Sequence, residues 1–248
     1  PLGGRHFECY SEDPLLSGEI GAAFVVGVQE HRVGTTVKHL VGNDFETDRM
    51  TVDVRIGDRA LREIYLEPFE RVVRAGGWGV MSAYNGVNGT PMASNGVLQS
   101  EVLKDEWGFD GVVVSDWRAA RETVGAALGG LDVAMPALEN PWGPKLVAAV
   151  RAGEVPEEVV DDKVRRVLRL AARVGVLDGA PPPVTAVPAP LDGAAVAHEV
   201  AARSFVLARN ESFTLPLEAA GLTRVAVVGA GLGGLAAAAR LAALGHGV

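Results

Sequence analysis

The sequence is poor in cysteine, in long apolar runs and in clustered basic residues. Cys9 is the single cysteine, so no internal disulfide can form and nothing requires an oxidising compartment. We expect this thiol to be buried or half-buried. No apolar run reaches the ~20 residues of a membrane span, and no Lys/Arg run could follow a phosphate backbone. With 31 acidic against 23 basic residues and a net charge of −8, neither membranes nor nucleic acids are expected as partners.

The first residues also lack two features. Residues 1–5 have no signal-peptide pattern, and the chain has no initiating methionine. We therefore expect the chain to begin inside a longer protein, and we assign a cytoplasmic location from the segment present. The 248 residues, 48% of them hydrophobic, suffice for one large α/β domain or for one domain and a fragment.

Short β-branched runs alternate with longer amphipathic stretches between residues 15 and 175. Strands are predicted at residues 35–41, 79–84, 111–115 and 131–134. Helices are predicted at residues 58–74, with a kink or break at Pro68, and at residues 156–174. This alternation is typical of βα units around a parallel sheet.

A proline-rich stretch divides the chain. Residues 179–192 cannot continue a helix and predict an interdomain linker between residues 1–178 and residues 193–248. Beyond it we expect a helix at residues 193–208 and a strand at residues 224–228. The predicted fold is α/β: a partial (β/α)₈ TIM-type barrel, the linker, and the start of a second α/β domain.

Polar and aromatic side chains follow several predicted strands. Asp116 and Trp117 follow residues 111–115, Lys38 and His39 end the first strand, and Met81 and Tyr84 lie in the second. Catalytic groups of a barrel lie at such strand ends, and this set of donors, acceptors and rings suits a sugar. From spacing alone, however, an N-cap of the next helix is the favoured role for Asp116.

Four ordered motifs carry a family resemblance. They are GRHFECYSEDP (residues 4–14), KHL (38–40), MSAYN (81–85) and WGFDGVVVSDW (107–117). Over about residues 1–136 the chain resembles the catalytic domain of glycoside hydrolase family 3. Residues 193–217, with LARNE and LPL, resemble the entry to that family's second domain.

The resemblance implies a retaining, β-glucosidase-like enzyme that acts on a small-molecule β-glycoside with a terminal glucosyl-type residue. Its nucleophile would be Asp116, which forms a covalent glycosyl-enzyme. The subsite of the non-reducing sugar would consist of Arg5, Lys38, His39, Met81 and Tyr84, with Trp117 on its floor. The positive charges of Arg5 and Lys38 would help to keep the nucleophile ionised. No metal or cofactor is expected.

The chain departs from the family pattern in what surrounds these residues. The first barrel strands, with an Asp that holds distal hydroxyls, are expected to be missing. The general acid is also expected to be missing, because two-domain members take a Glu from the second domain. Single-domain members use a His in a Gly-His-Gly stretch shortly after Lys-His, whereas here Lys38-His39 leads to Val41-Gly42-Asn43-Asp44.

Strand geometry makes a further prediction at Lys38 and His39. Successive side chains of a regular strand point to opposite faces, so both could not reach one sugar. We therefore predict a strained or cis peptide at or next to Lys38–His39.

The last residues carry a different motif. Gly229, Gly231 and Gly234 fit G-x-G-x-x-G after the predicted strand 224–228 and resemble the start of an FAD-dependent oxidoreductase of the carotenoid desaturase type. The acidic residue expected about 20 positions later lies past residue 248. Two rival hypotheses therefore remain: an FAD- or NAD-dependent oxidoreductase fragment, and a non-catalytic sugar-binding remnant.

Overall fold

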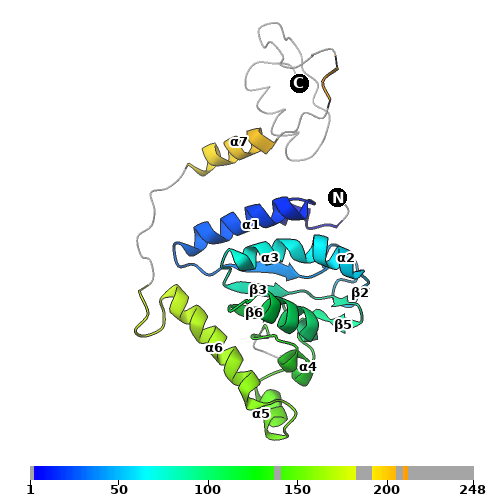
Figure 1. Cartoon of the computed structure of the whole chain (residues 1–248), viewed down its shortest axis with the longest axis vertical. Helices are drawn as coiled ribbons and strands as arrows, with labels where there is room; N and C mark the ends of the chain where they lie inside the picture. Colours follow the sequence, from blue (N-terminus) through cyan, green and yellow to red (C-terminus); the bar gives the residue numbers. More distant parts are fainter. Residues whose placement is uncertain (1–2, 137–140, 183–191, 205–208, 212–248) are drawn as a thin grey trace. The chain divides into compact units, whose positions relative to one another are not determined.

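A computed structural model describes residues 3–136, 141–182, 192–204 and 209–211 (Figure 1). The chain divides into two compact units, Pro1–Val187 and Pro188–Val248. In the second unit, the described residues form helix α7 (Gly193–Ser204), which covers part of the predicted helix at 193–208. The predicted strand at 224–228 and the glycine motif lie outside the described residues.

The first unit is built on a parallel sheet of strands β1 (Thr36–Leu40), β3 (Gly79–Ser82) and β6 (Val112–Ser115), in the order β1-β3-β6. These three strands confirm the predictions at 35–41, 79–84 and 111–115. The fourth predicted strand is reduced to one parallel bridge between Val114 and Val133. Among the described residues, these strands thus form an open three-stranded sheet and not a closed barrel.

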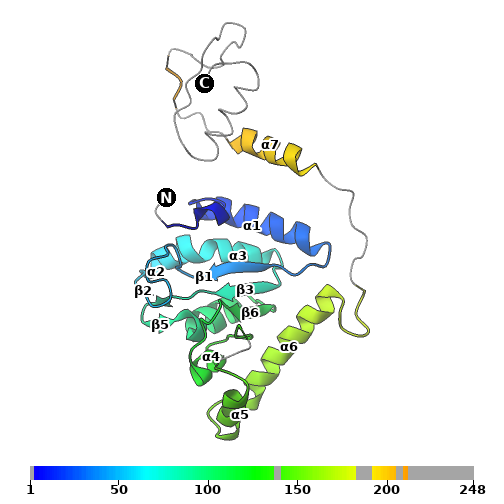
Figure 2. The ribbon, with the colours of Figure 1, turned by 180° about the vertical axis from the view of Figure 1, so that it is seen from behind.

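The connections between these strands are helical. Between β1 and β3 lie α2 (Asp58–Ala60), η2 (Leu61–Leu66) and α3 (Glu67–Arg74), and between β3 and β6 lie η3 (Met92–Ser94) and η4 (Val97–Glu106). Helix α1 (Pro14–Gln29) precedes β1, whereas α4 (Thr123–Leu128), α5 (Pro144–Arg151) and α6 (Glu157–Val174) follow β6. Helices α1 and α3 pack against each other, and α3 also contacts β1 (Figures 1 and 2). A small second sheet joins β2 (Asp53–Val54), β4 (Gly86–Val87) and β5 (Thr90–Pro91) near the end of β1.

Proline changes the type of helix at residues 58–74. The predicted helix is present, but it passes through the π-helical segment η2 before Pro68 occupies the first turn of α3. Proline has no N–H and its ring collides with the preceding turn, so a wider turn just before it accommodates the ring. The predicted kink or break at Pro68 is thus present only as a change of helix type, from π to α, just before the proline, while residues 58–74 stay helical.

Helix α6 begins and ends at residues that favour helix termini. Pro156 precedes the helix as its N-cap residue, and Gly175 ends it with φ 82°, a left-handed conformation that glycine adopts without a steric penalty. Arg166 of α6 donates to the backbone carbonyls of Phe109 and Gly111, at 2.8 and 3.0 Å. These bonds attach α6 to the segment that enters β6.

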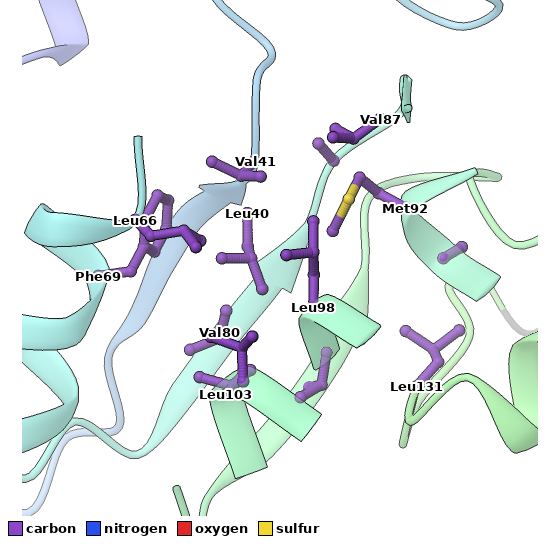
Figure 3. Packing of buried hydrophobic residues seen from close by; sticks show 14 of the residues in the cluster. Leu40, Val41, Leu66, Phe69, Val80, Val87, Met92, Leu98, Leu103 and Leu131 are labelled. Carbon is purple, nitrogen blue, oxygen red and sulfur yellow. The ribbon is translucent and has the colours of Figure 1, made fainter. Parts of the chain in front are cut away.

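The core lies between the sheet and its helices. Leu40, Val80 and Val113, one from each strand, have 0–1% of their surface exposed. Figure 3 shows Leu40 and Val80 together with Leu103 of η4, in the same buried cluster. Apolar residues of every strand therefore meet helix residues, and the polar ends of the strands remain for the site.

One buried ion pair lies at the entry to β6. The Nζ of Lys104 is 2.7 Å from Asp132 Oδ1, and the exposed fractions of the two side chains are 7% and 0%. The other oxygen, Oδ2, accepts a 2.7 Å hydrogen bond from the backbone N–H of Val113. Burial lowers the pKa of Lys104 and raises that of Asp132, although the charge of each residue partly offsets this by stabilising the ionised form of its partner.

The prediction for Cys9 is wrong. The residue is exposed, because it follows the short helix η1 (His6–Glu8), none of whose residues is buried. Within the described ranges, no helix is long and apolar enough to cross a membrane.

Candidate active site

The site begins with two hydrogen bonds that join the strand ends. The N–H of Ala83 donates to the carbonyl of Leu40 at 2.6 Å, and the N–H of Asp116 donates to the carbonyl of Ser82 at 3.1 Å. The carboxyl ends of β1, β3 and β6 therefore lie at one edge. In a parallel α/β sheet, this edge is where ligands bind.

The carboxylate of Asp116 has two different oxygens. Oδ1 accepts a 2.7 Å hydrogen bond from the N–H of Trp117. Oδ2 is buried and accepts no hydrogen bond from the residues that the structure describes. The spacing of Asp116 in the sequence favoured a role as helix N-cap, but this prediction is wrong, because the next helix, α4, begins only at Thr123. The unsatisfied oxygen makes the carboxylate a candidate for chemistry, since burying such an atom is costly.

His39 faces this carboxylate. Its Nε2 is 3.3 Å from Asp116 Oδ2, and the exposed fractions of the two side chains are 11% and 14%. Burial lowers the pKa of His39, and the carboxylate raises it by less. Lys38 and Arg5 lower it further. At neutral pH the imidazole is therefore neutral.

The peptide between Lys38 and His39 is cis, which confirms the prediction made from strand geometry. The Nζ of Lys38 is 2.7 Å from Glu8 Oε2, while the neighbouring His39 contacts Asp116. The peptide between Leu40 and Val41 is also cis.

Glu8 is a site residue that the sequence analysis missed. One carboxylate oxygen pairs with Arg5 Nε and the other with Lys38 Nζ. The hydrogen bond from Lys38 holds the pKa of Glu8 below its usual range, and the one from Arg5 adds to this effect. The spacing of Arg5 and Glu8, three residues apart in one motif, was the available signal.

Tyr84 follows β3 at the same edge. Burial raises the pKa of its phenol, and the negative charge of Asp116 raises it further. The guanidinium of Arg49 lies over the ring, 5.1 Å from its centroid. Arg49 was also not predicted, and it adds a cation–π contact that holds the ring.

The remaining predicted residues are less engaged. Trp117 directly follows Asp116, but 56% of its surface is exposed. Met81 is half-buried in β3, opposite Val114 of β6. The structure thus groups Arg5, Lys38, His39, Tyr84 and Asp116 by contact or charge, whereas Met81 and Trp117 are placed beside them by the strands alone. No group of three potential metal ligands occurs in the described parts of the chain.

A carboxylate at the end of a parallel strand, beside a neutral imidazole and two cations, offers charged donors and acceptors of the kind that sugar hydroxyls bind. The fold and the site thus define a parallel α/β domain that carries a carboxylate, an imidazole and two cations around the carboxyl ends of its strands.

The chain belongs to glycosyl hydrolase family 3, because residues 1–170 match the N terminal domain of that family. The match extends further than the motifs did. A β-glucosidase of Rhizobium radiobacter is 45% identical over an alignment of 233 residues, which covers 92% of this chain and 28% of that protein.

Solved structures give the same relationship. β-Glucosidase 3B from Thermotoga neapolitana in complex with glucose is 44% identical with a TM-score of 0.66, covering 70% of this chain and 25% of that one. A β-glucosidase of this family from Bifidobacterium adolescentis is 38% identical with a TM-score of 0.76, covering 88% and 32%. The chain therefore spans less than a third of the length of these relatives.

The oxidoreductase hypothesis receives no support from these comparisons. The β-glucosidase relative matches over 92% of the chain, and Gly229, Gly231 and Gly234 lie outside the described residues. The start of a second α/β domain is likewise not supported.

Proposed function

We propose that the chain carries the nucleophile side of a retaining β-glucosidase active site, with Asp116 as the nucleophile. The observation that carries the proposal is the Asp116 carboxylate at the end of β6, with Oδ1 held by the Trp117 N–H and Oδ2 facing His39 Nε2 at 3.3 Å, without a hydrogen bond from the part of the chain that the structure describes. The names of the relatives support a β-glucoside as substrate.

The chemistry follows from the two oxygens. The hydrogen bond to Oδ1 fixes the orientation of the carboxylate, and Oδ2 attacks the anomeric carbon. A bond forms between this carbon and Asp116, the glycosidic C–O bond breaks, and the leaving oxygen takes a proton. Water then hydrolyses the glycosyl-enzyme. Because neighbouring side chains cover Oδ2, they have to move aside for a glucoside to reach it.

The surrounding groups bind the sugar. Lys38 and Arg5 present donors to ring hydroxyls, and their charges favour the ionised form of Asp116. The neutral His39 offers one nitrogen as a donor and the other as an acceptor. Glu8, the carboxyl group that contacts Arg5 and Lys38, is not suited to protonate the leaving oxygen, because the two cations hold it as a carboxylate.

The test separates glycosylation from protonation of the leaving group. A general acid contributes ~10²–10⁴-fold, most of all for poor leaving groups. The purified chain should cleave 4-nitrophenyl β-D-glucoside slowly and leave octyl β-D-glucoside and cellobiose essentially untouched. Azide should accelerate turnover where deglycosylation is limiting, because it attacks the glycosyl-enzyme without a general base.

Two variants make the assignment specific. Asp116→Ala should lose the aryl glucosidase activity by several orders of magnitude, whereas Asp161→Ala, an exposed carboxylate of α6, should retain it. Equal rates for Asp116→Ala and the wild type would refute the nucleophile. Equal efficiency on aryl and alkyl glucosides would reveal an acid in the chain, with Glu46 as the first residue to test. Glucose binding without any turnover would instead identify a non-catalytic sugar-binding remnant.

A further inference from the structure

Glu8 connects two parts of the site that are far apart in the sequence. Arg5 immediately precedes η1, and Lys38 lies in β1. Because these two segments are distant in the sequence, the local backbone does not by itself bring the Arg5 and Lys38 side chains together. The carboxylate of Glu8 contacts both, with Oε1 at Arg5 Nε and Oε2 at Lys38 Nζ. Each oxygen therefore serves one cation.

The two cations need such a contact to keep one geometry. The side chains of Arg5 and Lys38 are about a third exposed, at 30% and 37%, and their stems carry much rotamer freedom. Like charges also repel each other. The hydrogen bond to Glu8 is the main cause that raises the pKa of Arg5, and the Asp116 carboxylate lies near enough to add a smaller increase. Without an anion between them, either cation could turn towards Asp116 and occupy the space of the sugar.

The carboxylate of Glu8 is thus balanced by two cations, and the second carboxylate of the site, Asp116, has to stay available to the substrate. A carboxylate that pairs with Arg5 and Lys38 together leaves Asp116 to the substrate. The motif context agrees with this assignment, because the 3₁₀ turn of η1 brings the N–H of Glu8 to 3.2 Å from the carbonyl of Arg5 while the Glu8 side chain contacts Lys38 of β1.

We infer that Glu8 is a positioning residue, which fixes Arg5 and Lys38 as hydroxyl donors beside Asp116 and prevents them from pairing with the nucleophile. This inference rests on the proposed function for its kinetic consequence, but its structural part can be tested separately.

The kinetic test compares Glu8→Gln and Glu8→Asp with the wild type on 4-nitrophenyl β-D-glucoside. Glu8→Gln keeps the shape and removes the charge, and it should raise KM by about 10- to 100-fold while kcat changes less. Glu8→Asp keeps the charge but is too short to serve both cations, and it should recover part of the loss. Glu12→Gln, at an exposed position in the same segment, is the matched control and should behave as the wild type.

A second measurement does not depend on activity. Acylation by an N-hydroxysuccinimide ester, followed by peptide mass spectrometry, reports how freely each lysine reacts. Lys38 should react several-fold faster in Glu8→Gln than in the wild type, because the amine is released from its ion pair. Exposed Lys145 should react equally in both and serves as the internal reference. Far-UV circular dichroism of each variant checks that the fold is retained.

The outcomes are distinct. An unchanged rate at Lys38 would overturn the inference, as would an unchanged KM in an active Glu8→Gln variant. A wild-type chain that shows the expected labelling but cleaves no glucoside would overturn the proposed function and support the Glu8 contact.

Discussion

Replacing Lys104 by methionine should destabilise the protein, because it leaves the buried carboxylate of Asp132 without its ion-pair partner. Methionine matches the length of the lysine stem and keeps its packing, but it removes the charge 2.7 Å from Asp132 Oδ1. The aspartate side chain has no exposed surface, so water cannot replace the lost partner. The carboxylate keeps the N–H of Val113 and a favourable charge from Lys163.

The magnitude follows from these contacts. Removing one partner of a buried ion pair costs about 3–5 kcal/mol, because the other charge stays buried and uncompensated. Since Val113 and Lys163 still stabilise Asp132, we expect the lower end, about 3 kcal/mol, or roughly 6–12 °C in Tm. Adding Asp132→Asn should restore most of this loss, because the amide oxygen can accept the Val113 N–H without a charge.

The assay is urea unfolding followed by far-UV circular dichroism, with equal slopes required for comparison. Lys145→Met, at an exposed position of α5, is the control and should change stability by less than about 0.5 kcal/mol. A Lys104→Met loss below about 1 kcal/mol, or a double variant no more stable than the single one, would refute the reasoning from burial.

Three further predictions concern stability. Arg166→Met removes the donors to the carbonyls of Phe109 and Gly111 and should cost about 2 kcal/mol in urea unfolding, so an unchanged midpoint would contradict the role of these bonds. Leu103→Ala, at a fully buried position, should cost about 2–5 kcal/mol by the same assay, and a smaller loss would mean that the core collapses around the cavity. Burial lowers the pKa of Lys163 to about 8 from 10.5, so the unfolded chain binds more protons between these pH values. Stability should therefore rise with pH across that window by up to about 3 kcal/mol relative to Lys163→Met, whereas parallel pH curves would argue against a depressed pKa.

Much of the secondary structure could be predicted because its causes are local. The strands around Val37, Val80 and Val113 are short apolar runs that contain β-branched residues and have polar exits, and such runs form buried strands in many contexts. Pro68 alters its helix through its own ring, and Gly175 ends α6 through its own backbone freedom. The order of four motifs was likewise sufficient to identify the family.

Pairing could not be predicted from the same signals. Residues 131–134 have strand-forming residues, yet only Val133 bridges to β6, because the Asp132 side chain bonds the Val113 N–H and the Lys104 amine instead. Strand propensity measures how a residue fits a pleated surface, and it does not state which partner is present.

The sequence by itself determined the three main strands, the helices at 58–74 and 156–174, the family and the candidate nucleophile, while the tertiary structure decided which of the site residues contact one another. Local spacing favoured Asp116 as a helix cap, but its N–H bonds to Ser82 and the next helix begins seven residues later, at Thr123. Glu8 received no role at all until folding brought Lys38 to within 2.7 Å of it across 30 residues of chain. A cap or a helical turn depends on neighbours in the chain, whereas an ion pair depends on distance in space, and only the packed sheet supplies that distance.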